Sequence, residues 1–101
     1  MVYKQRILLT VRTEIRNIVA YIADVLCEPT AAASFLDEFD YQFGLVADNP
    51  ELHALSRMPE LAALGYRSML VKKYVALYYI EGDSVVVAHV FHQSQNYARL
   101  I

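Results

Sequence analysis

The sequence predicts an α+β fold in which an N-terminal strand and a helical hairpin pack on a curved antiparallel sheet of about four strands. Two observations carry this prediction. Apolar residues recur at three- and four-residue spacing through two segments of the first half, which is the period of amphipathic helices. After residue 65 the chain holds three runs of β-branched and aromatic residues separated by turn-forming residues, as adjacent strands do. The chain has 101 residues, enough for one domain with a core, so we expect a single domain over residues 1–101.

The first strand and the first helix are expected before Pro29. Residues 3–10 mix polar side chains with Ile7, Leu8 and Leu9, which suits a strand at a sheet edge. Thr13 can cap the helix that follows, and Pro29 blocks its continuation. The apolar stripe of this helix comprises Ile15, Ile18, Val19, Ile22, Val25 and Leu26.

A second helix is expected from about Thr30 to the residues before Asn49-Pro50, because a residue that precedes proline disfavours the helical conformation. The two helices form the hairpin. Residues 50–64 contain two prolines and no sustained period, so they should form a loop with a short turn of helix. The stripe of the second helix comprises Phe35, Leu36, Phe39, Phe43 and Val46, with Asp37, Glu38 and Asp40 outside it.

Three strands are expected in the last third, over residues 66–71, 74–80 and 85–92. Lys72-Lys73 joins the first two, and residues 81–84 supply the Gly, Asp and Ser of a second hairpin turn. The strands are therefore antiparallel neighbours. Apolar side chains occupy both faces, so one face should pack on the helices while the other is only partly covered. The second face is a candidate site.

The charge of the chain counts against tight, nonspecific binding to nucleic acid. The net charge is −2, whereas such proteins usually carry a basic excess. The charges are distributed unevenly: residues 24–51 contain seven acidic residues and no Lys or Arg, and residues 1–23 contain four basic residues and one acidic residue. A surface formed by the first segment and the sheet would therefore be locally basic.

The composition predicts no cofactor, no metal site and no membrane span. The single cysteine, Cys27, cannot form an internal disulfide and is expected to be a small buried hydrophobic residue in a helix. His53, His89 and His92 have no ligand spacing, and His89 has the opposite strand parity to His92. No apolar run reaches the roughly 18 residues that cross a bilayer, and the N-terminus lacks a secretory leader, so we expect a cytoplasmic protein.

The order of these segments resembles the RelE/ParE toxin superfamily. No single segment is diagnostic, and the resemblance rests on their order and spacing from about Tyr3 to Leu100. The matching segments are Asn49-Pro50-Glu51, Gly65 to Val71, Lys73-Tyr74-Val75, Tyr78-Tyr79-Ile80, Val90-Phe91-His92, and Tyr97 with Leu100.

This resemblance implies the toxin of a type II toxin–antitoxin pair, which forms a hetero-oligomer with its cognate antitoxin. Toxins of this fold bury an amphipathic helix and an added strand of that partner. RelE-like members cut messenger RNA on the ribosome, whereas ParE-like members inhibit DNA gyrase. The fold alone does not choose between the two activities.

The leading expectation is a ribosome-dependent, metal-independent endoribonuclease. Cleavage by a 2′-hydroxyl needs a base, an acid and cations that hold the phosphate charge. His92 supplies an imidazole, a group whose unperturbed pKa suits proton transfer at neutral pH. Arg67 offers a planar fork of donors to a phosphate, and Tyr97 could stack on a base or donate a proton. In the resemblance these three residues hold the catalytic positions, and Arg67, Lys72, Lys73 and Arg99 are the expected nucleic-acid contacts.

Each of these residues also has a structural interpretation. Arg67 could be an edge arginine paired with Glu51 or Glu60, and His92 could be a hydrogen-bonding group at a strand end. The ring of Tyr97 could cover the core with its hydroxyl in water. Lys72-Lys73 could be a solvated turn.

One segment departs from the pattern of the RelE-like nucleases. Between the closing His and Tyr these proteins commonly carry one or two basic residues, but this chain has Gln93-Ser94-Gln95-Asn96. Fewer phosphate contacts would weaken attachment to RNA. Inhibition of DNA gyrase, and a module that only binds an antitoxin, therefore stay open as alternatives.

Overall fold

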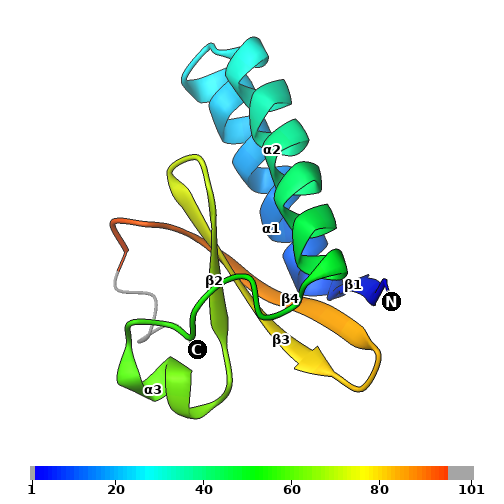
Figure 1. The fold of residues 1–101 in the computed structure, drawn as a ribbon. Coiled ribbons are helices and arrows are strands. Elements are labelled where there is room, and N and C mark those ends of the chain that lie inside the picture. The colour runs from blue at the N-terminus through cyan, green and yellow to red at the C-terminus, as the bar shows by residue number, and fades with distance from the viewer. Residues whose placement is uncertain (1, 96–101) are drawn as a thin grey trace.

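The computed structural model describes residues 2–95, in which a helical hairpin stands on one face of a four-stranded sheet (Figure 1). The predicted α+β fold is confirmed. In chain order the elements are β1 (Lys4–Ile7), α1 (Leu9–Ala20), the π-helical segment η1 (Tyr21–Val25), α2 (Pro29–Asp48), α3 (Pro59–Ala63), β2 (Arg67–Val71), β3 (Tyr74–Glu81) and β4 (Ser84–His92). No helix in the described part of the chain is long and apolar enough to span a membrane.

The sheet has the strand order β1-β4-β3-β2. As predicted, β2, β3 and β4 are antiparallel neighbours, but β1 pairs in parallel with β4, from Lys4 opposite Ser84 to Ile7 opposite Val87. Parallel neighbours require a long connection, which the two helices and the β2–β3 hairpin provide here. A bulge shifts the register between β3 and β4. Leu77 pairs with His89, and the next residue, Tyr78, pairs with Val87. Such a bulge increases the local twist of a sheet.

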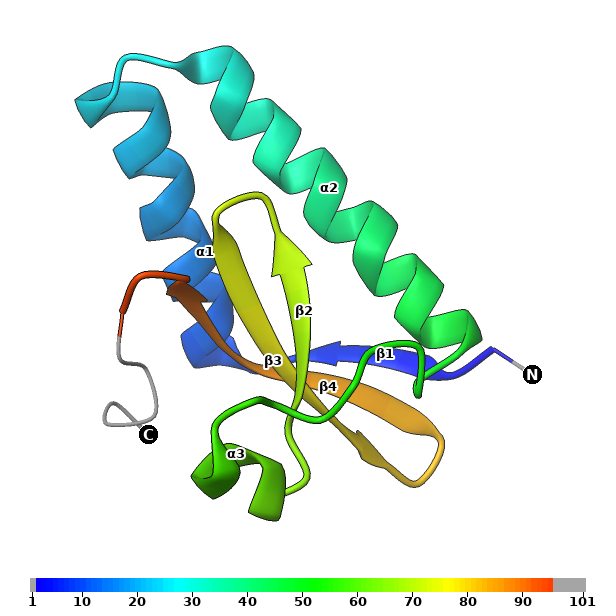
Figure 2. The same cartoon turned by 60° about the vertical axis from the view of Figure 1, so that its left-hand side comes forward.

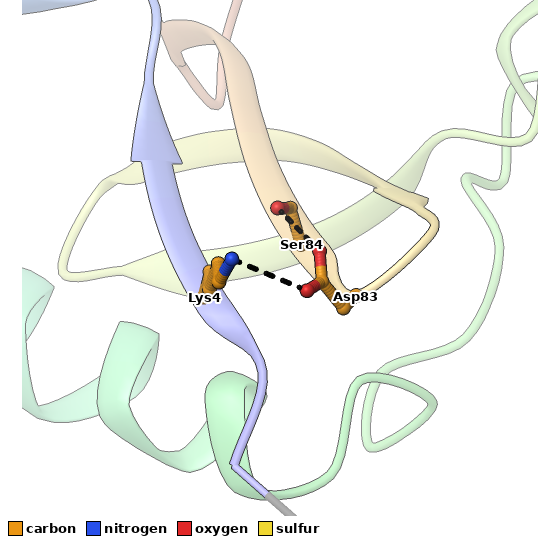
Figure 3. Close-up of polar contacts among 3 residues, drawn as sticks. All are labelled: Lys4, Asp83 and Ser84. Carbon is orange, nitrogen blue, oxygen red and sulfur yellow. Dashed lines mark hydrogen bonds and ion pairs between the residues drawn. The ribbon is translucent and has the colours of Figure 1, made fainter.

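Short contacts hold the start of β1 at the β3–β4 turn (Figure 3). The amide N–H of Lys4 donates to the carbonyl of Asp83 (2.8 Å), and the Lys4 ammonium lies 3.4 Å from the Asp83 carboxylate. Arg6 forms a second ion pair with Glu81 at 3.7 Å. Both ion pairs are exposed and contribute little to stability, so the backbone pairing sets the register.

Thr13 and Cys27 of the helical hairpin differ from their predicted roles. The first helix begins at Leu9, after extended Leu8, so Thr13 is not its cap. Thr13 lies within the helix, where its hydroxyl donates to the carbonyl of Leu9 (3.4 Å). Cys27 is exposed rather than buried, because the π-helical segment ends before it and the chain reverses there with a φ of 55°. Pro29 then starts α2, where its missing N–H costs nothing.

The main core lies between the hairpin and the sheet. One stripe of α2 meets the alternate residues of the strands that face it, as the helical period requires. The core side chains include Val11, Phe35, Phe39, Phe43 and Val46 from the helices and Met69, Val71, Ala76, Tyr78, Val85, Val87 and Val90 from the strands.

The opposite face of the sheet is partly covered, as predicted. Leu61 of α3 packs on Val75 and Leu77, and Tyr66 and Phe91 lie at the margin of this second cluster. Figure 2 shows α3 on the other side of β2 and β3 from the hairpin. The segment predicted as a loop with a short helical turn therefore covers part of this face through α3.

Candidate functional site

Three of the residues predicted as functional line one cavity. His92 at the end of β4 and Lys72-Lys73 in the β2–β3 turn meet the tip of the helical hairpin, where the cavity has a volume of about 480 Å³. The antiparallel pairing brings them together, because Tyr74 follows the turn and lies opposite His92. The lining residues are Tyr21, Ile22, Leu26, Glu28, Ala31, Ser34, Phe35, Lys72, Lys73, Tyr74 and His92.

The ring of His92 is held in one orientation. It meets the ring of Tyr74 edge to face, with centroids 5.2 Å apart. Its Nδ1 accepts from the amide N–H of Ser94 (3.1 Å) and lies 2.7 Å from the Ser94 hydroxyl. A backbone amide can only donate, so Nδ1 carries no proton in this arrangement and the neutral ring has its proton on Nε2. His92 is therefore a hydrogen-bond donor through Nε2.

The uncharged segment that replaces the expected basic residues shapes the turn after β4. The amide N–H of Gln93 donates to the carbonyl of Lys73 (2.9 Å), which joins this turn to the β2–β3 turn. The side-chain oxygen of Gln95 accepts from the amide N–H of His92 (2.8 Å). The side chain of Gln95 therefore has a structural role in placing His92, whereas Gln93 contributes through its backbone.

Tyr74 is a lining residue of this cavity that the sequence interpretation missed. Its ring lies between His92 and Phe35, with the Phe35 centroid also 5.2 Å away. Burial raises the pKa of Tyr74, and the nearby hydroxyl of Tyr21 raises it further, so Tyr74 keeps its proton at neutral pH. Its position directly after the turn and opposite His92 was the available sequence signal.

Arg67 lies away from this cavity, at the other end of β2. It pairs with Tyr78, four positions along β3 from the Tyr74 that pairs with His92. Strand geometry therefore separates Arg67 from His92 by about 13 Å along the strands and about 10 Å across two of them. The structure does not bring these two predicted catalytic residues together.

The guanidinium of Arg67 is engaged in a contact with the loop that follows α2. Its Nη1 donates to the carbonyl of His53 (2.7 Å), and the buried hydroxyl of Tyr78 donates to the carbonyl of Pro50 (2.9 Å). The suggested pairing of Arg67 with Glu51 or Glu60 is wrong, since the two ion pairs found among residues 2–95 are those of Lys4 and Arg6. Arg67 holds a backbone carbonyl instead.

The remaining predicted site residues, Tyr97 and Arg99, lie outside the described residues, so their roles stay predictions. His89 lies on the sheet face opposite to His92, as the parity predicted. Its ring stacks on Phe91 (5.7 Å) and meets Tyr66 (5.9 Å). Within residues 2–95, no three His, Cys, Asp or Glu side chains are grouped as metal ligands.

Two histidines give a prediction for pH dependence. Burial lowers the pKa of His53, whose Nε2 is buried without a hydrogen-bond partner, and burial lowers the pKa of His89, an effect that Glu14 opposes. In the folded state these groups bind fewer protons than in the unfolded state, where a His titrates near 6.5. The free energy of unfolding should therefore be highest above pH 6.5 and fall as the pH drops through 6.5.

The measurement is urea unfolding at several pH values between 7.5 and 5.5. The variant His53→Gln/His89→Gln cannot take up these protons on unfolding, so its free energy of unfolding should change less over this range. The wild-type and variant values at pH 7.5 give the effect of the substitutions themselves. A wild-type free energy that is constant over the range, or an equal slope in the variant, would contradict the prediction.

Comparisons with known proteins give one matching family model and several similar solved structures. The model of the "ParE toxin of type II toxin-antitoxin system, parDE" matches residues 6–97. No curated protein matches the sequence at a significant level. Similar solved structures include the chromosomal ParDE toxin–antitoxin system from Pseudomonas aeruginosa (P. aeruginosa), with a TM-score of 0.71, 14% identity, and coverage of 90% of this chain and 96% of that chain.

The RelBE2 toxin–antitoxin complex from Mycobacterium tuberculosis is similar as well, with a TM-score of 0.62, 23% identity, and coverage of 91% of this chain and 99% of that chain. At these identities the two structures establish the fold. The family model matches most of the sequence and therefore shows the family to which the chain belongs. The chain belongs to the ParE toxin family of type II toxin–antitoxin systems.

Proposed function

We propose that this toxin acts by inhibiting DNA gyrase. The observation that carries the proposal is the match to the ParE toxin model over residues 6–97, because gyrase inhibition is the activity implied by ParE-like resemblance. Inhibition by binding needs a complementary surface and no catalytic residues. The contact of Arg67 with the loop after α2, rather than with the cavity of His92, is consistent with this mode.

We also propose that an antitoxin binds in the groove between α1 and α2. Both similar structures are named as toxin–antitoxin systems or complexes. The groove between these helices has a volume of about 360 Å³ and an apolar floor that includes Ile15, Val19 and Phe39. Its charged lining residues are Arg12, Arg16 and Asp40, so basic side chains exceed acidic ones. An amphipathic helix with acidic residues would complement this groove, and the toxin would then form a hetero-oligomer.

Cleavage of messenger RNA on the ribosome is the second candidate. The cavity at the hairpin tip favours it, because Lys72 and Lys73 could hold a phosphate beside the Nε2–H of His92. Arg67 does not take part in that cavity, and the basic residues expected after His92 are absent. If the chain is a nuclease, cleavage would therefore depend on His92 and on the residues of the β2–β3 turn and of the turn after β4.

The test is a supercoiling reaction in which the purified chain is titrated into DNA gyrase with relaxed plasmid. We expect supercoiling to fall with toxin concentration, and His92→Ala to inhibit as well as the wild type. Relaxation by a type I topoisomerase is the control and should be unaffected. A parallel reaction with translating ribosomes should leave the message intact.

Three outcomes separate the candidates. Supercoiling that continues at every toxin concentration overturns the gyrase proposal. If the ribosomal message is then cut by the wild type and not by His92→Ala, the chain is a nuclease. If both reactions proceed undisturbed, the chain is an antitoxin-binding module without either activity.

A further inference from the structure

We propose that the cavity at the hairpin tip is the surface that binds gyrase, and that it takes an acidic protein segment anchored by one apolar side chain. This inference rests on the proposed function and specifies its site. The tip surface is defined here by Tyr21, Leu26, Lys72, Lys73 and Tyr74, all of which line the cavity.

The floor of the cavity accounts for the apolar anchor. Ile22, Phe35 and Tyr74 form it, and Phe35 and Tyr74 hold each other edge to face at 5.2 Å. A volume of about 480 Å³ is within the range of sites that enclose a ligand or a side-chain anchor. Because these rings are fixed by the core, the cavity exists before a partner arrives, which lowers the cost of binding.

Part of the rim is apolar and exposed, as in many protein interfaces. Tyr21 is 48% exposed and Leu26 is 47% exposed, and both lie at the end of the first helix. Val25, at the same tip, is 66% exposed. Large apolar side chains gathered around a preformed cavity mark a binding surface rather than scattered surface residues.

The charge of the rim selects the partner. Lys72 and Lys73 are exposed and form no ion pair among residues 2–95, while Glu28 is the one acidic residue among the described residues that line the cavity. Opposite charge would steer an acidic segment to this turn. The hydroxyl of Tyr74 adds a neutral donor that a carboxylate can use.

The backbone at the rim is consistent with a functional surface. Cys27 and Lys72 are the non-glycine residues with positive φ in the described part of the chain, at 55° and 57°. Cys27 lies between two lining residues, and Lys72 is itself one. A two-residue hairpin turn with a positive φ at its first position favours glycine there, so lysine at this position carries a conformational cost.

The tip surface is separate from the groove assigned to the antitoxin. The lining residues of the two cavities do not overlap, although both are built on the same helices. Substitutions at the tip should therefore reduce gyrase inhibition and leave neutralisation by the antitoxin unchanged.

The test compares matched variants in the supercoiling reaction. Lys73→Glu and Leu26→Asp each place a carboxylate opposite the acidic segment, so each should raise the concentration for half inhibition by at least about tenfold. Arg57→Glu and Leu64→Asp are the controls, because both residues are exposed, lie near α3 and are outside the cavity. Both controls should inhibit like the wild type. Circular dichroism establishes that all four variants are folded.

The outcomes keep the inference distinct from the proposed function. If the wild type inhibits gyrase and the tip variants inhibit equally well, the tip surface is not the gyrase-binding site, while the proposed function stands. If the wild type does not inhibit, the proposed function itself fails. If Lys73→Glu instead abolishes cleavage of ribosomal message, the cavity binds RNA and the inference is overturned.

Discussion

Replacing Phe35 with alanine should lower the free energy of unfolding by about 3–5 kcal/mol, the usual cost of removing a buried aromatic ring. Phe35 is 1% exposed and lies on the stripe of α2 that faces the sheet. Its ring holds Tyr74 edge to face, so the substitution leaves a cavity at the junction of the hairpin and β3. A domain of this size has a total stability of about 5–15 kcal/mol, and a large share of it would be lost.

Urea unfolding followed by circular dichroism measures this effect. Leu36→Ala is the matched control, because Leu36 is the next residue of the same helix and is 39% exposed. Its substitution should cost less than about 1 kcal/mol. Equal shifts of the unfolding midpoint for the two variants would show that the stripe of α2 does not form the core.

The contrast between these two residues also shows what helical periodicity can predict. Phe35, Phe39, Phe43 and Val46 were placed on one stripe from their spacing, and all four are buried. Leu36 was placed on the same stripe but lies at its margin, beside the groove between the helices. Spacing identifies the buried face of a helix, whereas the exposure of a residue at its edge depends on how closely the neighbouring helix approaches.

The ends of the first helix could not be predicted in this way. Thr13 is a good capping residue by type, but the chain enters the helix at Leu9, directly after β1 ends at Ile7. The length of β1 is set by its pairing with β4, eighty residues later in the chain. Local sequence signals in residues 1–13 cannot predict this pairing with β4 or its parallel direction.

The candidate site was predicted in part for a similar reason. His92 meets Lys72-Lys73 because β3 and β4 form a hairpin in which Tyr74 opposes His92. That proximity follows from the predicted turns. Arg67 was grouped with His92 by resemblance, yet in the same arrangement it lies at the far end of the β2–β3 hairpin from the turn. The predicted strand order already implied this separation.

The role of Arg67 can be tested with the loop contact that it shares with Tyr78. Replacing Arg67 with methionine removes the bond to the His53 carbonyl, and Tyr78→Phe removes the bond to the Pro50 carbonyl. A hydrogen bond from a charged donor contributes about 1.5–3 kcal/mol, and a buried carbonyl left without its partner costs about 1–3 kcal/mol. Burial raises the pKa of Tyr78, so its hydroxyl donates throughout the neutral pH range.

Because both bonds hold the same loop, the double variant should lose less stability than the sum of the two single variants. Once one bond is removed and the loop can leave the sheet, the second has less to hold. A double-mutant cycle from urea unfolding measures this coupling. The amides of Ser56 and Ser68, which bond across the same loop and β2, should exchange with solvent faster in every variant.

The same variants distinguish a structural arginine from a catalytic one. If Arg67 acts only on the loop, Arg67→Met and Tyr78→Phe should change toxicity in parallel, in proportion to the stability that each removes. If Arg67 contacts RNA during cleavage, Arg67→Met should abolish toxicity while Tyr78→Phe, which touches the same loop from β3, retains it. Toxicity should therefore be compared after allowing for the stability that each variant loses. A loss of toxicity in Arg67→Met beyond that explained by its stability would show that Arg67 has a catalytic role.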